Sequence, residues 1–375
     1  MVNNIYIHVP FCGSKCPYCS FASVPYDRQS ARSYLRALEK EIQASRRSGV
    51  QLSPETIYVG GGTPSIFPET QFGCFTALLR ETFNLERCSE WTMEANPDSL
   101  TEQKVKAARD AGIDRVSLGV QAIDESTLEA SGRKYTASDV KERIDTLLKS
   151  GIVNIGADLI AGLPGVTTEA WERTSEWICR AGVQHISVYS LSIEPDCCWG
   201  RDGVSMPGDE EAVELLNISS GILERHGFLQ YEISNFALPG FECFHNLNFW
   251  RGGDYIGFGP SASSRIGLRR QTNIAEVDEY VRRIDSGQSA VSSEETLSPR
   301  ADAGERFAFA LRLSQGVDLQ EFVDGIGEGA AARMDDWLRQ LAELESEGLV
   351  LSSGNRWKLS KRGRYFADRV AQMVI

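Results

Sequence analysis

Hydrophobic and polar residues follow two alternating patterns along the first 227 residues. Short runs rich in apolar and β-branched residues, typical of buried strands, occur at 5–9, 56–60, 91–95, 115–120, 154–160 and 185–190. Between them, helical spacing of apolar residues predicts helices such as 32–48, 102–111, 140–150 and 169–181, each directly followed by a glycine. Strands that alternate with helices predict an α/β fold with a parallel sheet, and six units rather than eight predict a partial TIM-like βα barrel. A functional site is then expected at the carboxyl ends of the strands.

The pattern changes after a last barrel helix at 210–226. Residues 228–295 are aromatic and rich in glycine, with few helical signals, and we expect a separate small module there. From 296 to 375, a helix beginning at Pro299, a helix at 333–347, short strands at 349–351 and 357–359 and a closing basic helix resemble a winged-helix arrangement. The predicted domains are therefore 1–227, 228–295 and 296–375.

Composition narrows the class of protein. The chain has 375 residues, of which 42% are hydrophobic and 24% charged, which excludes a disordered or fibrous protein. Its net charge of −13 opposes binding to nucleic acid, so the basic stretch 356–369 is expected to contact the acidic helix 333–347 instead. No apolar run reaches the roughly 18 residues of a membrane span, and residues 1–9 do not look like a secretory signal, so we expect a cytoplasmic protein. Peripheral contact with a membrane stays open.

The strongest chemical signal is a cysteine loop after the first predicted strand. Cys12, Cys16 and Cys19 have the spacing C-x-x-x-C-x-x-C. Three thiolates from one short loop can hold a [4Fe–4S] cluster and leave one iron open to the methionine part of S-adenosylmethionine (SAM). The alternative is structural zinc, which takes four ligands, usually as two C-x-x-C pairs, and the sequence has no second pair. The remaining cysteines are expected to be reduced, since an export signal is missing.

Polar or glycine residues at the ends of the other strands predict a place for SAM. Gly60 to Pro64 follow the second strand, where backbone amides are expected to bind the amino-acid end of SAM. Glu94, Gln121 and Asp158 are polar residues on apolar strands and need partners when buried. For each residue alone, a turn glycine, a helix cap or an arginine partner is the alternative, but all of them lie at strand ends.

These motifs together identify a family. The segments Ile5 to Cys12, Gly60 to Pro64, Gly119 to Gln121, Asp158 to Pro164 and Tyr231 to Trp250 resemble the HemW family, the radical SAM heme chaperones related to oxygen-independent coproporphyrinogen III oxidase. The resemblance implies that Tyr18 stacks on the adenine of SAM, with Ser192 near the same site. It also implies contacts with SAM from Tyr6, Gly61, Gly62, Thr63, Glu94, Gln121, Arg133 and Asp158.

Two features separate this chain from the oxidases. They carry a fourth cysteine where this chain has Phe21, and an N-terminal extension where this chain has five residues before Tyr6. The heme motif of the HemW family, His-Asn-x-x-Tyr-Trp, occurs as residues 245–250, with Phe249 in place of the tyrosine. The chain is therefore expected to be a heme chaperone, and the alternatives are a coproporphyrinogen III oxidase and a SAM-binding regulator of DNA.

His245 is the candidate heme ligand, in a segment of aromatic residues that suits a porphyrin. Cys243 is the next candidate for the iron, and Arg251, Arg269 and Arg270 are candidate partners of the propionates. The expected partners are heme, acceptor hemoproteins and an electron donor for the cluster, and no nucleic acid. The heme site and the SAM site are expected to be independent, because they lie on different parts of the chain. Whether SAM is cleaved, and so whether the protein is an enzyme, stays open.

Overall fold

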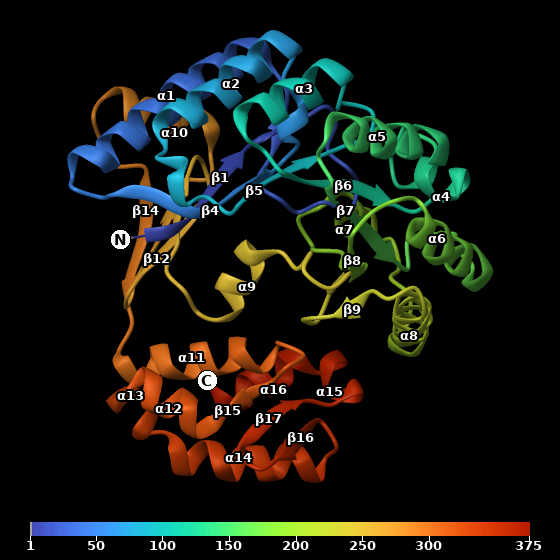
Figure 1. Cartoon of the computed structure of the whole chain (residues 1–375), viewed down its shortest axis with the longest axis vertical. Coiled ribbons are helices and arrows are strands. Elements are labelled where there is room, and N and C mark those ends of the chain that lie inside the picture. Colours follow the sequence, from blue (N-terminus) through green and yellow to red (C-terminus); the bar gives the residue numbers. More distant parts are fainter. Residues whose placement is uncertain (1) are drawn as a thin grey trace.

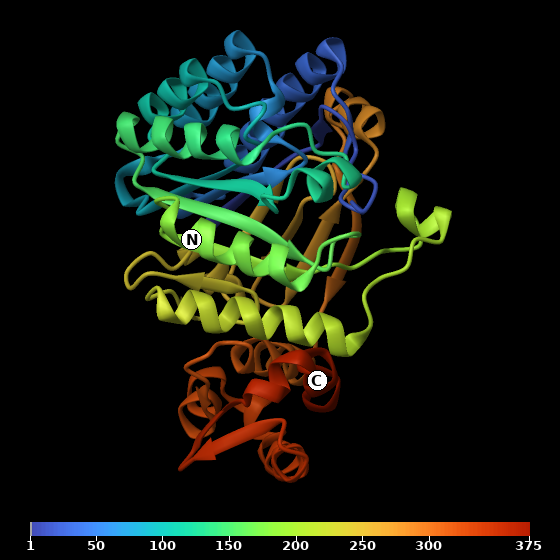
Figure 2. The same ribbon diagram turned by 90° about the vertical axis from the view of Figure 1, so that its right-hand side faces the viewer.

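The structure is a computed structural model that describes residues 2–375. Its buried hydrophobic residues form two cores, one from Ile5 to Ala290 and the other from Ala303 to Val374. The second core belongs to a C-terminal domain that lies below the barrel in Figure 1 and Figure 2. No helix in this described part of the chain is long and apolar enough to cross a membrane.

A partial barrel of parallel strands holds the first core, as the sequence predicts. The adjacent parallel strands, in order, are β1 (Val2–Val9), β4 (Leu52–Gly61), β5 (Glu90–Ala95), β6 (Arg115–Gln121), β7 (Asn154–Ala161) and β8 (His185–Ser190). The helices of the βα units cover the outside of the sheet (Figure 1): α1 (Arg28–Arg47), α2 (Glu69–Thr82), α3 (Glu102–Ala111), α5 (Ala137–Ser150), α6 (Thr168–Arg180) and α8 (Asp209–Arg225). Shorter elements follow the strand ends: β2 (Phe11–Cys12), β3 (Val24–Pro25), η1 (Pro64–Ile66), η2 (Leu85–Arg87), α4 (Glu125–Ala130) and α7 (Cys198–Asp202). The segment carrying α7 projects from the side of the barrel in Figure 2.

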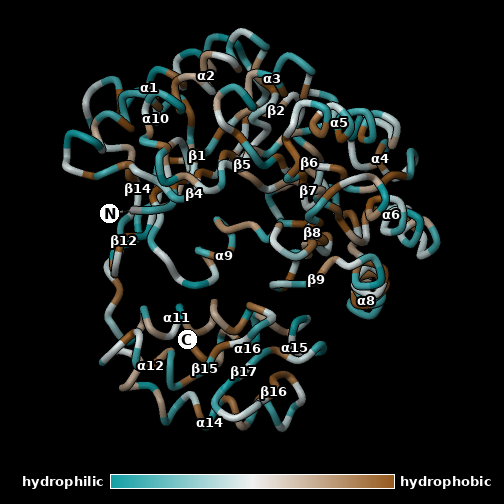
Figure 3. Tube along the Cα trace, viewed as in Figure 1, coloured by the Kyte–Doolittle hydropathy of each residue, from teal (hydrophilic) through white to brown (hydrophobic). Residues whose placement is uncertain are grey.

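The two faces of the barrel strands differ in polarity. On β1, Ile5, Ile7 and Val9 are fully buried in the core under the helices. On β4, the alternate residues Thr56 and Tyr58 take part in hydrogen bonds inside the barrel. Successive side chains of a strand point to opposite faces, so a strand can serve the core and the site together. Figure 3 shows the hydrophobic stretches of the chain running along the barrel strands.

The prediction of a separate module at 228–295 is wrong. Strand β10 (Asn235–Ala237) pairs with β8 and with β9 (Leu229–Gln230), while β11 (Ile256–Phe258) pairs with β1 at the other edge. A partial barrel leaves unpaired backbone groups on its two edge strands, and this segment satisfies them. Its aromatic residues Phe228, Phe236, Phe258 and Tyr280 pack in the barrel core. The segment also contains α9 (Phe244–Trp250), α10 (Val277–Asp285) and the sheet of β12 (Ser263–Ile266), β13 (Arg269–Asn273) and β14 (Val291–Thr296).

The C-terminal domain packs around Trp337. This ring stacks on Phe307 with 4.4 Å between centroids, and its Nε1 donates to the carbonyl of Val374 at 2.8 Å. The helices are α11 (Pro299–Leu311), α12 (Leu319–Ile326), α13 (Glu328–Ala331), α14 (Met334–Ser346), α15 (Lys361–Tyr365) and α16 (Ala367–Val374). They enclose a small sheet in the order β15 (Val317–Asp318), β17 (Arg356–Leu359) and β16 (Val350–Ser353).

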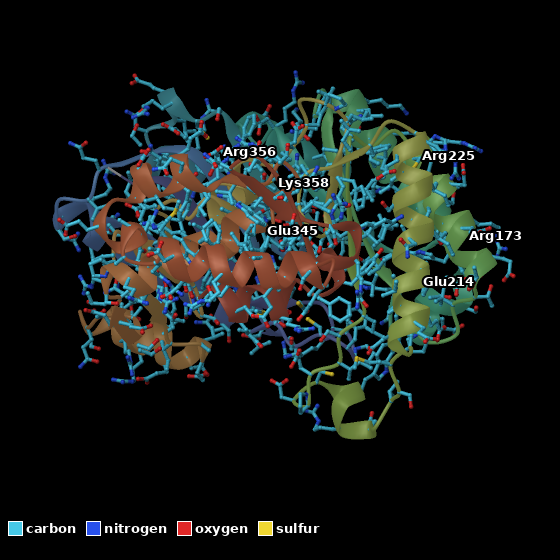
Figure 4. The ribbon with its side chains drawn as sticks, turned by 90° about the horizontal axis from the view of Figure 1, so that it is seen from below. Arg173, Glu214, Arg225, Glu345, Arg356 and Lys358 are labelled. Carbon is cyan, nitrogen blue, oxygen red and sulfur yellow. The ribbon has the colours of Figure 1, made fainter. Side chains whose placement is uncertain are left out.

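Basic residues at the end of the chain contact neighbouring elements. Arg369 pairs with Glu347 at 2.8 Å, and Arg362 donates to the carbonyl of Glu347 at 3.0 Å. Figure 4 shows Arg356 and Lys358 of β17 on the same face as Glu345 of α14. This face therefore carries charges of both signs, as the acidic helix led us to expect.

Candidate functional site

A cavity of about 330 Å³ opens at the carboxyl ends of the barrel strands. It brings together almost all of the predicted cluster and SAM residues: Cys12, Cys16, Tyr18, Cys19, Gly61, Gly62, Thr63, Glu94, Gln121, Arg133, Asp158 and Ser192. Tyr6 is the exception, because it lines a second cavity described below. We call this first cavity the SAM pocket.

The cysteine loop forms one wall of the SAM pocket. Its ends are fixed where the N–H of Val24 donates to the carbonyl of Pro10 and that of Tyr26 to the carbonyl of Cys12, both at 2.8 Å. The three thiols are half-buried and free, and burial raises the pKa of Cys19, with a further contribution from its neighbours Cys12 and Cys16. In residues 2–375, no three Cys, His, Asp or Glu side chains are placed to hold one metal ion, as a zinc site requires. Three thiols that share a cavity without meeting at one point fit a cluster, in which each thiolate binds a different iron.

The glycine loop after β4 packs directly against the cysteine loop. Gly61 has a φ of +106°, and a Cβ there would lie 2.7 Å from the ring of His8. A Cβ on Gly62 would lie 2.5 Å from the carbonyl oxygen of Phe11. The N–H groups of Gly62 and Thr63 donate to the carbonyls of Val9 and Phe11, both at 2.7 Å. The glycines are therefore needed for close approach of the two loops.

The backbone amides of this loop have partners within the protein. The N–H of Gly61 donates to Glu94 Oε2 at 3.1 Å, so the amides of Gly61, Gly62 and Thr63 are all paired. Binding of the amino-acid end of SAM by backbone amides here stays a prediction. The sequence pattern alone does not distinguish a glycine that binds a ligand from one that lets two loops meet.

Two half-buried carboxylates face the interior of the SAM pocket. Glu94 Oε1 accepts from the hydroxyl of Tyr58 at 2.8 Å, and both oxygens of Asp158 accept from Ser117 Oγ at 3.1 Å. Burial, and then the charge of Asp158, raises the pKa of Glu94 to about 7, while burial raises the pKa of Asp158. Among the described residues, neither carboxylate caps a helix or forms an ion pair, which were the alternatives to a ligand-binding role. Their remaining lone pairs suit hydroxyl or ammonium groups.

A chain of hydrogen bonds crosses the pocket from Arg133 to the cysteine loop. Arg133 donates to the hydroxyl of Tyr18 at 2.8 Å and to Asn96 Oδ1 at 3.2 Å. Asn96 Nδ2 donates to Thr63 Oγ1 at 3.2 Å, and the Thr63 hydroxyl lies 3.7 Å from Cys12 Sγ. The sequence reasoning missed Asn96. The sequence spacing could have indicated Asn96, since it lies two residues after Glu94 and therefore on the same face of the strand.

Gln121 ends β6 in a strained conformation. Its φ of +62° is in the left-handed region, which non-glycine residues rarely adopt and which is concentrated at functional sites. Ser261, the other non-glycine residue with positive φ in the described chain, lines the second cavity. Both cavities therefore contain one strained residue.

The second cavity has a volume of about 260 Å³ and contains the predicted heme motif. It is lined by Tyr6, His8, His245, Asn248, Phe249, Tyr255, Ser261 and Ser263, and we call it the His245 cavity. His245 lies at the start of α9, where burial lowers the pKa of the imidazole to about 4, so the ring is neutral at physiological pH.

The other candidates for the heme site lie elsewhere. Cys243 does not line the cavity; its thiol points to Glu90 Oε1 at 3.4 Å, and burial raises the pKa of the thiol to about 12. Arg269 pairs with Glu294 at 2.5 Å, and Arg270 pairs with Glu295 and Glu305. These two arginines are therefore already neutralised by carboxylates. Arg251 is exposed directly after α9.

The two cavities share a wall, although they are built from different parts of the chain, and the independence of the two sites in binding stays a prediction. The hydroxyl of Tyr58 contacts Glu94 of the SAM pocket, and its ring lies 5.2 Å from the ring of His245. Tyr6 stacks against Tyr58 with 6.3 Å between centroids and hydrogen-bonds to His8 at 3.1 Å. Segments distant in sequence meet here because α9 packs against β4.

Comparison with known proteins agrees with this geometry. A family model of the radical SAM superfamily matches residues 6–178, and one of the HemN C-terminal domain matches residues 297–366. The radical SAM match implies a [4Fe–4S] cluster and SAM as cofactors. The solved structure of coproporphyrinogen III oxidase (HemN) from Escherichia coli has a TM-score of 0.88 over 100% of this chain and 90% of its own, at 22% identity, which shows a common fold.

Relatives of known name are similar over their full length. The heme chaperone HemW of Lactococcus lactis is 33% identical over 100% of this chain and 97% of its own length. HemW of Bacillus subtilis is 32% identical over 98% of each chain, and HemW of Escherichia coli is 28% identical over 99% of this chain and 98% of its own. The chain therefore belongs to the HemW family.

Proposed function

We propose that this protein is a cytoplasmic radical SAM-type heme chaperone, which binds heme and transfers it to acceptor hemoproteins. The observation that carries the proposal is the His245 cavity, in which a neutral imidazole stands among Tyr6, Phe249 and Tyr255. Neutral imidazole is a common axial ligand of heme iron, and flat apolar walls suit a porphyrin. The names of the HemW relatives support the same function.

In this proposal, Cys12, Cys16 and Cys19 hold the cluster, which needs an external electron donor. When bound, the cluster supplies an electron to SAM. The chain's own residues bind and orient SAM: Glu94 and Asp158 accept from its hydroxyl or ammonium groups, and the chain from Arg133 to Thr63 fixes the wall beside Cys12. Tyr18, Gln121 and Ser192 line the same pocket. Tyr6 acts through His8 rather than from within the SAM pocket.

The size of the His245 cavity limits how heme binds. Its 260 Å³ is below the roughly 300 to 1,000 Å³ of typical ligand sites, so a porphyrin has to extend beyond it. Phe249, at 37% exposed, marks the side where the cavity meets the surface. Partial exposure of the bound heme is consistent with a protein that gives its ligand away.

The alternative function is that of the oxidase. The likeness to HemN supports the same fold, and 22% identity supports no more than that. Phe21 stands where the oxidases have a fourth cysteine, and it is 64% exposed at the mouth of the SAM pocket. The third hypothesis, a regulator that binds DNA, is weakened because Arg362 and Arg369 of the terminal basic stretch contact Glu347.

The test is anaerobic reconstitution of the full chain followed by parallel assays of heme binding, coproporphyrinogen conversion and 5′-deoxyadenosine release. His245→Ala should lose or shift the heme absorbance band while keeping its iron and sulfide content. Phe244→Ala is the matched control, because Phe244 precedes His245 on α9 but is exposed and does not line the cavity. Conversion of coproporphyrinogen, or an unchanged heme spectrum in His245→Ala, would contradict the proposal.

A further inference from the structure

A chain of three hydrogen bonds lies behind the imidazole of His245. Asn4 Nδ2 donates to the carbonyl of Asp254 at 3.1 Å, which turns Asn4 Oδ1 towards Thr56. The Thr56 hydroxyl donates its proton to Asn4 Oδ1 at 2.8 Å. Thr56 Oγ1 also lies 2.8 Å from His245 Nδ1. The side chains of Asn4 and Thr56 are both buried, so water does not compete for these contacts.

The protons in this chain determine which nitrogen of His245 carries hydrogen. A hydroxyl has one proton to donate, and that of Thr56 goes to Asn4, because an amide oxygen can only accept. Thr56 Oγ1 must therefore accept from His245, which requires an N–H at Nδ1. With the proton on Nδ1, the neutral ring has its free lone pair on Nε2. No group in residues 2–375 forms a hydrogen bond with Nε2.

We infer that Asn4 and Thr56 are positioning residues that hold His245 in the Nδ1–H tautomer and present Nε2 to the His245 cavity as the ligand of heme iron. Histidines that bind metals generally donate their other ring N–H to a fixed acceptor, which sets the orientation of the ring and raises its basicity. The tautomer follows from the hydrogen bonds alone. The identity of the metal rests on the proposed function.

The backbone around His245 is held by a separate contact. Both oxygens of Glu90 accept backbone N–H groups at the start of α9, from Phe244 at 2.9 Å and from His245 at 3.0 Å. The imidazole also packs against the ring of Tyr58 at 5.2 Å. Glu90 and Tyr58 therefore fix the position of the ring. The hydrogen bond with Thr56 determines which of its two nitrogens carries the proton.

His8, the other histidine of the cavity, is held in the opposite tautomer. Its Nε2 lies 2.8 Å from the carbonyl of Ala22, which can only accept, so Nε2 carries the proton. Its Nδ1 then accepts from the hydroxyl of Tyr6 at 3.1 Å. Both nitrogens of His8 are used within the protein. Of the two histidines, His245 is the one with a free lone pair.

The test begins with the wild-type protein without heme. Labelling the four histidines with ¹⁵N and assigning His245 from the spectrum of His245→Ala gives the shifts of its two ring nitrogens. We expect a protonated Nδ1 and an unprotonated Nε2 in the folded apoprotein. A protonated Nε2 would overturn the inference, and the tautomer itself is measured in the wild-type protein.

Two variants of Thr56 and one matched control test the role in binding. Thr56→Val keeps the shape of the side chain but removes the acceptor, and we expect a mixture of tautomers and heme binding about 10-fold to 100-fold weaker, as for other partners of metal-bound histidine. Thr56→Ser should restore both. Thr92→Val is the control, since Thr92 is buried on the neighbouring strand at the position paired with Tyr58 and its hydroxyl has no partner.

The outcomes separate this inference from the proposed function. If Thr56→Val leaves both the heme affinity and the tautomer of His245 unchanged, the positioning role of Thr56 is overturned, even if His245→Ala loses heme. An Nδ1–H tautomer that depends on Thr56, together with a wild-type heme spectrum in His245→Ala, would overturn the assignment of Nε2 to iron. Loss of heme in both His245→Ala and Thr56→Val, with rescue by Thr56→Ser, would support both.

Discussion

The negative charge of Glu94 should lower the stability of the folded protein at neutral pH, compared with an uncharged side chain at this position. Its pKa is about 7 in the fold against an ordinary value of 4.5, mainly because of burial. Because the folded pKa is raised, the fold gains stability below pH 4.5 and loses it as the pH rises through 7. The full shift corresponds to roughly 3 kcal/mol, and since Glu94 lines an open pocket we reduce this to about 2 kcal/mol.

Glu94→Gln removes the charge and keeps both contacts, because the amide oxygen can accept from Gly61 while the amide NH2 donates to the hydroxyl of Tyr58, which can also accept. We therefore expect the variant to be about as stable as wild type at pH 4.5, where the wild-type carboxyl is also neutral, and about 2 kcal/mol more stable at pH 8. SAM should bind the variant more weakly at pH 8, where the wild-type carboxylate is charged.

The measurement is urea unfolding of the reduced apoproteins, followed by circular dichroism across this pH range. Glu86→Gln is the control, since Glu86 is an exposed carboxylate without an ion pair in the described chain. A difference between Glu94→Gln and wild type that stays constant with pH would refute the reasoning. It would mean that the empty pocket is solvated well enough to keep the carboxylate charged.

The remaining predictions concern the two loops of the SAM pocket. Changing any of the three loop cysteines to Ala should abolish the absorbance of the reconstituted cluster, whereas Cys74→Ala, at an exposed position on α2, should keep it. Gly62→Ala should lower stability by about 1 to 3 kcal/mol and impair cluster binding, since its Cβ would meet the carbonyl of Phe11. Gly73→Ala, in open space on α2, should instead raise stability by about 0.5 to 1 kcal/mol in the same unfolding assay.

The sequence predicted the parts of the barrel in which local pattern and fold agree. The strands from β1 to β8 are short apolar runs between helices, and helices such as α3 and α5 end at Gly112 and Gly151 in the left-handed conformation. The cysteine spacing and the position of polar residues at strand ends were equally local signals. Nearly all of the residues predicted in this way line the SAM pocket, together with others that carried no such signal.

What the sequence did not predict depends on pairing between distant segments. The strands β9, β10 and β11 have two or three residues each, which is too short for a recognisable pattern. They form strands because the edge strands of the open sheet have unpaired backbone N–H and C=O groups, with which these segments form hydrogen bonds. The aromatic residues of 228–295 suggested a small core of their own, whereas they complete the barrel core.

The same pairing explains why the two sites touch. On β4, the alternate residues Thr56, Tyr58 and Gly60 all face the interior: Thr56 contacts His245, Tyr58 contacts both His245 and Glu94, and a Cβ on Gly60 would lie 2.8 Å from the Glu94 carboxyl. At about 3.3 Å per residue, the inner face of one strand spans about 13 Å from the His245 cavity to the SAM pocket. A strand is stiff along its length, and Tyr58 occupies the middle of this span. Tyr58 therefore links the wall of the SAM pocket to the wall of the His245 cavity through its hydroxyl and its ring, which join the two sites within one side chain.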